Sequence, residues 1–246
     1  MPNIPKRTPK AVKEEKKVVR LKNPEYRVHV IGGGYDYIRL MYLLGFSGAK
    51  GFADADIILF TGGEDVDPAL YGEMAMRGTF FNRSRDEREK FVYENAVQAG
   101  IPMVGICRGG QFLNVMNGGR MWQHVDGHTR DHPAFEIDID GKVLREMVVT
   151  STHHQMMIPA DNAVTLMIAA QSSNLNSYGQ EIQKAKPTMD DTEVVWYPDT
   201  KCLCFQPHPE MKNASSPLVN YFNSLLDNLI IPVVLENVSK QTKAAG

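Results

Sequence analysis

Short apolar runs alternate with amphipathic stretches along most of the 246-residue chain. The apolar runs predict buried strands over Val28–Ile31, Ile57–Thr61, Met103–Ile106, Val164–Ala169, Val194–Trp196 and Leu203–Gln206. Apolar residues at helical spacing predict helices over Asp36–Leu44, Asp86–Ala99, Gly109–Met116 and Pro217–Leu229. Short buried strands separated by helices are typical of the α/β class. We therefore expect a mostly parallel central sheet with helices on both faces.

The last predicted helix has the clearest start. Ser216 is expected to cap its N-terminus, and Pro217 to occupy its first turn, where proline has no hydrogen bond to lose. Its apolar stripe comprises Leu218, Phe222, Leu225 and Leu229. We expect this stripe to pack onto the sheet.

Both ends of the chain and one internal stretch depart from the alternating pattern. Residues 1–24 carry eight lysine and arginine residues against two glutamates before Pro24, and almost no large apolar residues before Val18. We interpret them as a solvated basic tail, with contact to a nucleic acid or an acidic partner as the alternative. The polar, aperiodic sequence of residues 171–192 predicts a loop. For residues 236–246 we expect a frayed C-terminal tail. A single catalytic domain is therefore expected over residues 25–235.

Composition limits the classes of protein that fit. The chain is 43% hydrophobic and 23% charged, which suits one globular domain, and its net charge of −2 provides no overall field to attract nucleic acid. Three cysteines without a disulfide framework indicate a reducing compartment. No apolar run approaches the roughly 20 residues of a membrane span, and a signal peptide's apolar core is missing. We expect a cytoplasmic protein that uses neither membrane nor nucleic acid.

The most informative local pattern is IPMVGICRGGQFLNVMNGG, in which Cys107 lies between a predicted strand and a predicted helix. Gly105 and Gly109 stand two residues to either side, which is the layout of a nucleophile elbow. This tight turn would present the sulfur at the helix N-terminus, where the helix dipole and Arg108 favour a thiolate. The alternative is a small buried cysteine at the end of a strand.

A histidine suited to activate a thiolate follows the last predicted strand, in CLCFQPHPE. The prolines on both sides of His208 exclude a helix. Residues two apart in an extended segment point the same way, so Glu210 can approach the imidazole and support its charged form. When the motif is considered by itself, a surface His-Pro-Glu turn is the alternative.

Three candidate segments each follow a predicted strand: Gly62-Gly63, Cys107 and His208. Ligands of open α/β sheets bind at the carboxyl ends of the strands. We therefore expect these segments to share one site.

Together these segments resemble a class I glutamine amidotransferase domain, specifically its gamma-glutamyl hydrolase branch. The matching blocks are TGGEDVDPALYGE (61–73), GICRGGQFLNVMNGG (105–119), TSTHHQMM (150–157) and FQPHPE (205–210), with RSRDEREKFVYENAV (83–97) as a weaker fifth. They occur in the family's order. The resemblance implies a flavodoxin-like fold and a Cys107–His208–Glu210 triad acting on gamma-glutamyl amide bonds. It also implies a small-molecule gamma-glutamyl substrate, such as glutamine, and no metal or organic cofactor.

The resemblance implies further site residues. Backbone N–H groups near Gly63 and at Arg108 would form an oxyanion hole, and Gly62 would lie against the substrate. Gln111 would help to bind the glutamyl group, and it lies one helical turn after Cys107. A solvent-facing glutamine is the alternative.

The adjacent His153 and His154 should face opposite ways in an extended segment, so only one of them can line the pocket. His154 is our choice because it matches the family's histidine in this block. A core or surface histidine is the alternative.

Two other polar groups receive ordinary structural interpretations. Asp65 and Asp67 fit turn and cap chemistry better than a pair of catalytic carboxylates. His124, His128 and His132 recur every four residues, but a glycine and a proline oppose one continuous helix, and no acidic or cysteine ligand stands at a zinc-like spacing. We therefore expect no metal site and place these histidines in a loop near the pocket mouth.

The expected reaction is hydrolysis through a gamma-glutamyl thioester on Cys107, which releases ammonia or an amine and then glutamate. We favour an amidotransferase-type glutaminase that passes ammonia to a synthetase or amidoligase partner in trans. One alternative is a stand-alone hydrolase of gamma-glutamyl amines or peptides. Another is a non-catalytic binding or regulatory module on the same fold.

Overall fold

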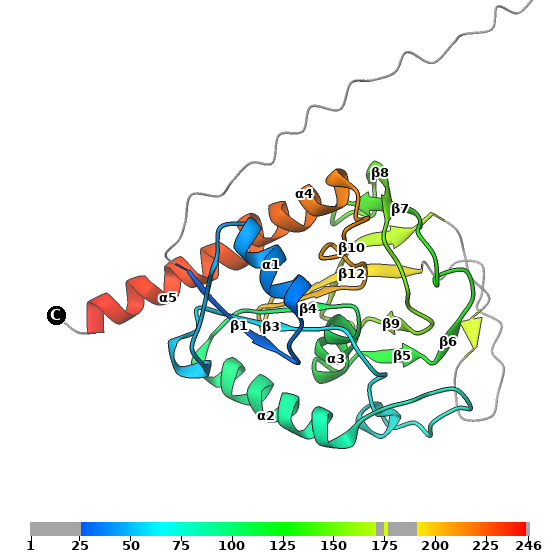
Figure 1. Cartoon of the computed structure of the whole chain (residues 1–246), viewed down its shortest axis with the longest axis horizontal. Helices are drawn as coiled ribbons and strands as arrows, with labels where there is room; N and C mark the ends of the chain where they lie inside the picture. The colour runs from blue at the N-terminus through cyan, green and yellow to red at the C-terminus, as the bar shows by residue number, and fades with distance from the viewer. Residues whose placement is uncertain (1–25, 171–174, 177–190, 245–246) are drawn as a thin grey trace, which may run out of the picture.

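The computed structural model describes residues 26–170, 175–176 and 191–244. Its centre is a nine-stranded sheet in the order β2-β1-β3-β4-β13-β12-β10-β7-β8 (Figure 1). Neighbours from β2 to β13 are parallel, and the pairs from β13 to β8 are antiparallel. The strands are β1 Arg27–Ile31, β2 Ser47–Gly48, β3 Ile57–Phe60, β4 Met103–Ile106, β7 His132–Ile137, β8 Val143–Val149, β10 Val164–Ala169, β12 Thr192–Tyr197 and β13 Cys202–Phe205.

Helices cover both faces of this sheet. They are α1 Tyr35–Leu43, α2 Arg83–Ala99, α3 Arg108–Met116, α4 Ser216–Leu225 and α5 Ile231–Ala244. Apolar residues of α1 and α4 form one core with the sheet, and those of α2 and α3 form the other (Figure 1). The predicted α/β class is confirmed, and the parallel strands occupy the half of the sheet that carries Cys107 and His208.

Short elements lie outside the main sheet. Two small sheets pair β5 Arg120–Trp122 with β9 Met156–Ile158, and β6 His124–Val125 with β11 Leu175–Asn176. Single turns of 3₁₀ helix occupy Phe52–Asp54 and Pro68–Tyr71. The basic tail and most of the predicted loop over residues 171–192 lie outside the described residues; within that loop, β11 forms and β12 begins at Thr192.

The C-terminal helix corrects two predictions. Its N-cap is Ser215, not Ser216, since the Ser215 hydroxyl accepts a hydrogen bond from the Leu218 N–H. After α4 the chain continues through a π-helical turn, Leu226–Ile230, into α5, so the predicted tail over residues 236–246 is helical as far as Ala244. The apolar stripe continues past the predicted end with the buried Ile230 and Val234, which explains why the helix does not stop there.

By length and composition, the continuous helix Ser216–Lys240 could span a membrane, with a mean hydropathy of 1.4 in its most apolar window. The sequence pattern hides this because serine, asparagine and aspartate interrupt the apolar residues. The helix also forms part of the core, since Leu218, Phe222 and Leu226 are fully buried. The core helix of a soluble protein meets the same criteria, so this finding is weak evidence for a membrane span.

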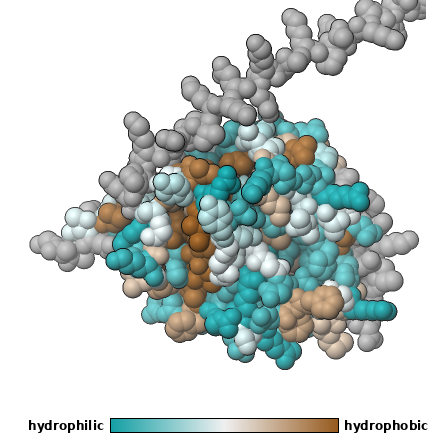
Figure 2. All heavy atoms as spheres, in the orientation of Figure 1, coloured by the Kyte–Doolittle hydropathy of each residue, from teal (hydrophilic) through white to brown (hydrophobic). Residues whose placement is uncertain are grey.

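The surface is mixed, with one apolar feature on the side seen in Figure 2. There a band of hydrophobic residues crosses the otherwise largely hydrophilic face, running from beside α1 down over the place that β1 occupies in Figure 1. Ile38 and Leu43 of α1 are about half exposed. One side of α1 therefore packs onto the sheet while these residues remain at the surface.

Candidate active site

Cys107 forms a strained turn between β4 and α3. Its φ of 52° and ψ of −114° are unusual for a residue with a side chain, and its N–H donates to the Phe205 carbonyl at 2.8 Å. A Cβ on Gly105 would lie 2.3 Å from the Gly109 carbonyl, and one on Gly109 would lie 2.2 Å from the Phe60 oxygen. The predicted elbow geometry is present, and the strain argues against an ordinary strand-end cysteine.

His208 and Glu210 follow β13 and are both buried. The His208 Nδ1 lies 2.6 Å from Glu210 Oε1, and its Nε2 lies 2.9 Å from the Thr152 hydroxyl. Burial opposes a charge on the imidazole, but Cys107 and Glu210 together raise the pKa of His208 to about 10. The ring is therefore oriented by a carboxylate and faces the cysteine, as the sequence predicts.

The ends of β3, β4 and β13 converge because these strands are parallel neighbours. A Cβ on Gly62 would lie 3.5 Å from the His208 ring and 3.7 Å from the Cys107 Cβ. A cavity of about 130 Å³ opens here, and its lining includes Cys107, Gln111 and His208. The three segments predicted to share a site do lie together.

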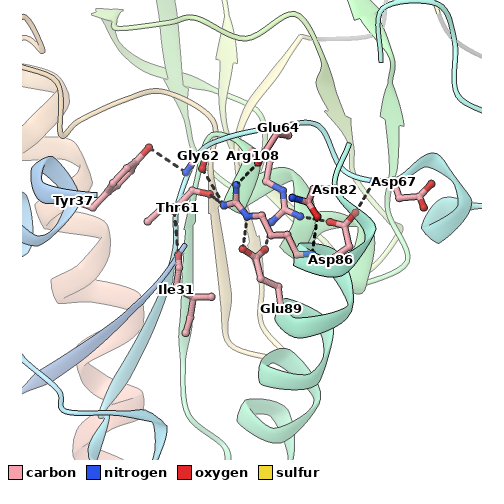
Figure 3. A network of polar contacts seen from close by, with 11 residues as sticks. Ile31, Tyr37, Thr61, Gly62, Glu64, Asp67, Asn82, Asp86, Glu89 and Arg108 are labelled. Atoms are coloured by element: carbon pink, nitrogen blue, oxygen red, sulfur yellow. Dashed lines mark hydrogen bonds and ion pairs between the residues drawn. The ribbon is translucent and has the colours of Figure 1, made fainter. Parts of the chain in front are cut away.

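Two backbone N–H groups beside the cavity can serve as an oxyanion hole. Among the described residues, the N–H groups of Gly63 and Arg108 donate to no acceptor, and both residues line the cavity. The Gly62 N–H instead donates to the Tyr37 hydroxyl at 3.1 Å (Figure 3). Donors left free in this way can bind a developing oxyanion.

A network of four residues, which we call the arginine network, supports this corner: the partly buried Arg85 and the buried Asp86, Glu89 and Arg108. The Arg108 guanidinium lies between Asp86 and Glu89 of α2 and pairs with both carboxylates (Figure 3). This corrects the prediction that its charge favours the Cys107 thiolate, since two carboxylates already balance that charge. The backbone N–H remains the part of Arg108 suited to the site.

Arg85 connects the arginine network to the glycine loop. Its Nε donates to Glu89 Oε1 at 2.7 Å, and one terminal nitrogen donates at 3.0 Å to the carbonyls of both Thr61 and Gly62. A Cβ on Gly63 would lie 2.0 Å from its other terminal nitrogen. The glycine at position 63 therefore makes room for the arginine that fixes this loop.

Gln111 and His154 both line the cavity. The Gln111 amide is buried and donates to the Gln155 carbonyl at 3.2 Å and to Gln206 Oε1 at 3.1 Å, so the solvent-facing alternative is wrong. His154 is partly exposed, and its Nε2 lies 3.1 Å from Asp65 Oδ1, which raises the pKa of this imidazole. His153 also lines the cavity, contrary to the prediction that only one of the two histidines does.

The aspartates act largely as predicted. Asp67 caps the 3₁₀ turn by accepting from the Ala69 N–H at 3.0 Å, and Asp65 accepts from the Phe80 N–H at 2.9 Å. The histidine series is placed differently from the prediction. His124 lies in β6, His132 begins β7, and His128 and His132 are buried. The predicted loop is therefore interrupted by the two-residue strand β6 and ends where β7 begins. The spacing of the histidines in the sequence does not indicate these strands.

Three contacts of the site were not predicted. Thr152 stands in the block TSTHHQMM, where the two histidines are the more conspicuous residues. Arg85 stands in the weakest block, and nothing in the neighbouring sequence predicts that it contacts the glycine loop. The Tyr37 hydroxyl accepts from the Gly62 N–H, and burial beside Glu210 and Cys107 raises the pKa of this hydroxyl, so it stays protonated. Nothing in its surrounding sequence indicates this role.

Comparison with known proteins identifies the family of the chain. Residues 49–194 match the model of a family described as Peptidase C26. The chain belongs to the Peptidase C26 family. Among its relatives, the glutamine amidotransferase-like protein YvdE of Lactococcus lactis subsp. lactis (strain IL1403) is 36% identical over 120 residues, which are 42% of this chain and 50% of YvdE. The match therefore spans half the length of that curated relative.

Solved structures share the fold of this Peptidase C26 member. A glutamine amidotransferase of Thermotoga maritima superposes with a TM-score of 0.53 and 12% identity, covering 87% of this chain and 92% of that one. A Thermoplasma acidophilum protein named as a GMP synthase subunit gives 0.58 and 13%, covering 88% and 98%. At such identities the likeness establishes the fold alone. The Peptidase C26 match and the curated relatives named as glutamine amidotransferase-like support a glutamine amidotransferase-type hydrolase in general.

Proposed function

We propose that the chain hydrolyses the side-chain amide of glutamine, or a related gamma-glutamyl amide, through a thioester on Cys107. The observation that carries this proposal is the strained Cys107 facing the His208–Glu210 pair, beside the free N–H groups of Gly63 and Arg108. A nucleophile, an oriented base and an oxyanion site are the three parts that acyl transfer requires.

In the proposed reaction, the Cys107 sulfur attacks the amide carbon, and the tetrahedral oxyanion accepts hydrogen bonds from the Gly63 and Arg108 N–H groups. His208 gives its Nε2 proton to the departing nitrogen as the C–N bond breaks, which leaves a gamma-glutamyl thioester. His208 then takes a proton from water, the hydroxide oxygen attacks the thioester carbon, and glutamate leaves as the thiolate re-forms. Glu210 holds the ring tautomer throughout and stabilises its charge.

The side chains around the cavity suit a glutamyl group. Its volume of about 130 Å³ admits a group of amino-acid size, and Gln111 and His154 supply polar contacts on its wall. We favour glutamine as substrate and a synthetase or amidoligase partner in trans that takes the ammonia, and the neighbour named as a GMP synthase subunit supports this choice. A stand-alone hydrolase of gamma-glutamyl amines or peptides is the second candidate.

The test is release of glutamate and ammonia from glutamine, and of amine from a panel of gamma-glutamyl amines, by the purified chain. Cys107→Ala should lower turnover by at least about 10³-fold. Cys202→Ala is the matched control, because Cys202 is also a free buried cysteine but lies at the start of β13, and it should keep turnover.

The substrate panel separates the two candidates. Turnover of the gamma-glutamyl amines without any partner supports the stand-alone hydrolase. Slow release from glutamine, with Cys107 alkylated by a glutamine-like diazoketone, supports a glutaminase that requires a partner. If Cys107→Ala retains turnover, or if wild type reacts with neither glutamine, nor any gamma-glutamyl amine of the panel, nor the diazoketone, the proposal is wrong.

A further inference from the structure

Behind the cavity wall, three histidines surround one carboxylate. His128 lies between β6 and β7, His132 begins β7, His153 precedes β9, and Glu193 belongs to β12. All four side chains are buried, and one nitrogen or oxygen atom from each lies within 4.8 Å of the others. We call this group the histidine cluster. It does not include His124, whose Nε2 lies 2.8 Å from the Arg77 carbonyl.

The three imidazoles point one nitrogen each at the same carboxylate oxygen. Glu193 Oε1 lies 3.0 Å from His128 Nδ1, 2.9 Å from His132 Nε2 and 3.5 Å from His153 Nε2. At zinc bond lengths of about 2.0–2.1 Å, ligand atoms of a tetrahedral site lie roughly 3.3–3.5 Å apart. Two of the distances to Glu193 Oε1, 2.9 and 3.0 Å, are shorter than this edge, and the third, 3.5 Å, matches it, so a metal site requires Glu193 Oε1 to move outward from the three rings.

The other nitrogen of each ring is fixed from outside the cluster. His128 Nε2 lies 2.9 Å from Asp191 Oδ2, His132 Nδ1 lies 3.0 Å from the Arg130 carbonyl, and His153 Nδ1 lies 2.8 Å from the Gln155 carbonyl. Both nitrogens of each ring thus face an oxygen acceptor, and a neutral imidazole has one N–H to donate, which we place on the outward nitrogen. In a neutral imidazole the inward nitrogen is then a lone pair, and an outward carbonyl or carboxylate partner is typical of metal-binding histidines.

Several inward atoms have no hydrogen-bond partner among the described residues: His128 Nδ1, His153 Nε2 and Glu193 Oε2. Buried polar atoms are nearly always satisfied, and lone pairs directed at a carboxylate repel it. A cation at the centre would satisfy all of them at once. We propose that His128, His132, His153 and Glu193 bind one divalent transition-metal ion, with zinc the best match to a set of imidazole and carboxylate ligands.

The site is structural in this proposal. Four protein ligands close the coordination sphere, whereas a catalytic zinc keeps a position for water or substrate. It ties the segment before β9 to β7 and β12. That segment also carries Thr152, whose hydroxyl lies 2.9 Å from His208 Nε2, and His154 on the cavity wall. The ion therefore fixes the segment that completes the candidate active site and takes no part in bond making.

The test is the metal content of the untagged full-length chain, purified after exposure to zinc and dialysis, measured by inductively coupled plasma mass spectrometry. Wild type should hold about one zinc per chain. Glu193→Gln and His132→Asn should each lower bound zinc at least about tenfold. His124→Gln, a histidine outside the histidine cluster, should keep the full amount.

Cobalt supplies a second readout that needs no variant. Wild type loaded with cobalt(II) should show the visible absorption of a tetrahedral site, and added zinc should remove it. This keeps the proposal testable if the variants do not fold, and it does not depend on the proposed reaction. Wild type that takes up neither ion, or zinc retained equally by Glu193→Gln and His132→Asn, would overturn the assignment.

Discussion

Two buried polar groups lie on either side of the candidate active site, and they differ in how their charges are balanced. In the arginine network, two guanidinium groups face two carboxylates, and each carboxylate accepts from an arginine (Figure 3). In the histidine cluster, three imidazoles direct one nitrogen each at a single carboxylate. The arginine network is complete within the chain, whereas the histidine cluster calls for a cation.

Both groups hold a segment of the same site. The arginine network fixes the glycine loop through Arg85, and the histidine cluster fixes the segment that carries Thr152. The site is thus supported on one side by ion pairs alone and on the other, in our proposal, by a bound ion. A chelator should then disturb the side held by the histidine cluster and leave the side held by the arginine network unchanged.

The largest expected effect comes from breaking the arginine network. Arg108→Met removes the ion-pair partner of Asp86 and one of the two ion-pair partners of Glu89, which leaves the buried Asp86 without a counter-charge. We expect the free energy of unfolding to fall by about 3–5 kcal/mol, measured by urea denaturation. Lys90→Met is the control, since Lys90 pairs with Glu94 at 4.0 Å on the surface, and it should change stability by less than about 0.5 kcal/mol. A loss below about 1 kcal/mol for Arg108→Met would contradict this account.

Removing the proposed metal ion from the histidine cluster should have the next largest effect on the free energy of unfolding. A ligand at 100 times its dissociation constant stabilises the native state by about 2.7 kcal/mol, so a strong chelator should lower the free energy of unfolding of wild type by about that amount. The arginine network needs no ion, so Arg108→Met should lose the same increment on chelation. Glu193→Gln should show no response to the chelator. A chelator response that survives in Glu193→Gln would place the ion elsewhere.

The site also shows which contacts can be predicted from the sequence. The parallel strands and their carboxyl-end residues follow from apolar runs and from the glycines around Cys107. In His208-Pro209-Glu210, the contact between His208 and Glu210 likewise follows from their spacing of two residues in an extended segment. For such local patterns the expected contacts and the observed ones agree.

Contacts between distant segments could not be predicted in this way. Glu193 and His153 complete the histidine cluster, but they lie far along the chain from His128 and His132, so a search for ligands at zinc-like spacing does not find them. Arg85 likewise reaches a loop before its own helix. The edge strand β8 and its neighbour β7 were not predicted, because they are only partly buried and lack clear apolar runs.

A pH series tests His208, which lies between the two groups. Its pKa is raised to about 10 in the folded chain from an ordinary value near 6.5, so its stabilising contribution is complete below pH 6.5 and is lost as the pH rises through 10. Glu210→Gln removes one of the partners that raise it. The variant should be less stable than wild type at pH 6.5, and the gap should narrow by on the order of 2 kcal/mol toward pH 10.

The comparison of wild type with Glu210→Gln isolates the titration of His208. The arginine network and the histidine cluster are present in both, so their contributions cancel in the difference. Urea denaturation at several pH values gives the two curves. A gap that stays constant or widens with pH would mean that Glu210 does not support the charged form of His208.

The smallest expected effect separates positioning from stability within the arginine network. Arg85→Lys keeps a charge near Glu89 but loses the paired hydrogen bonds to the Thr61 and Gly62 carbonyls, because an ammonium is a point donor without the planar fork. We expect kcat to fall about tenfold with little change in KM, since the glycine loop would hold the oxyanion less well. Arg83→Lys, on an exposed arginine of the same helix, should leave both constants nearly unchanged. A rise in KM with kcat intact would instead assign Arg85 to substrate binding, and the arginine network would then act on the cavity wall and not on the oxyanion site.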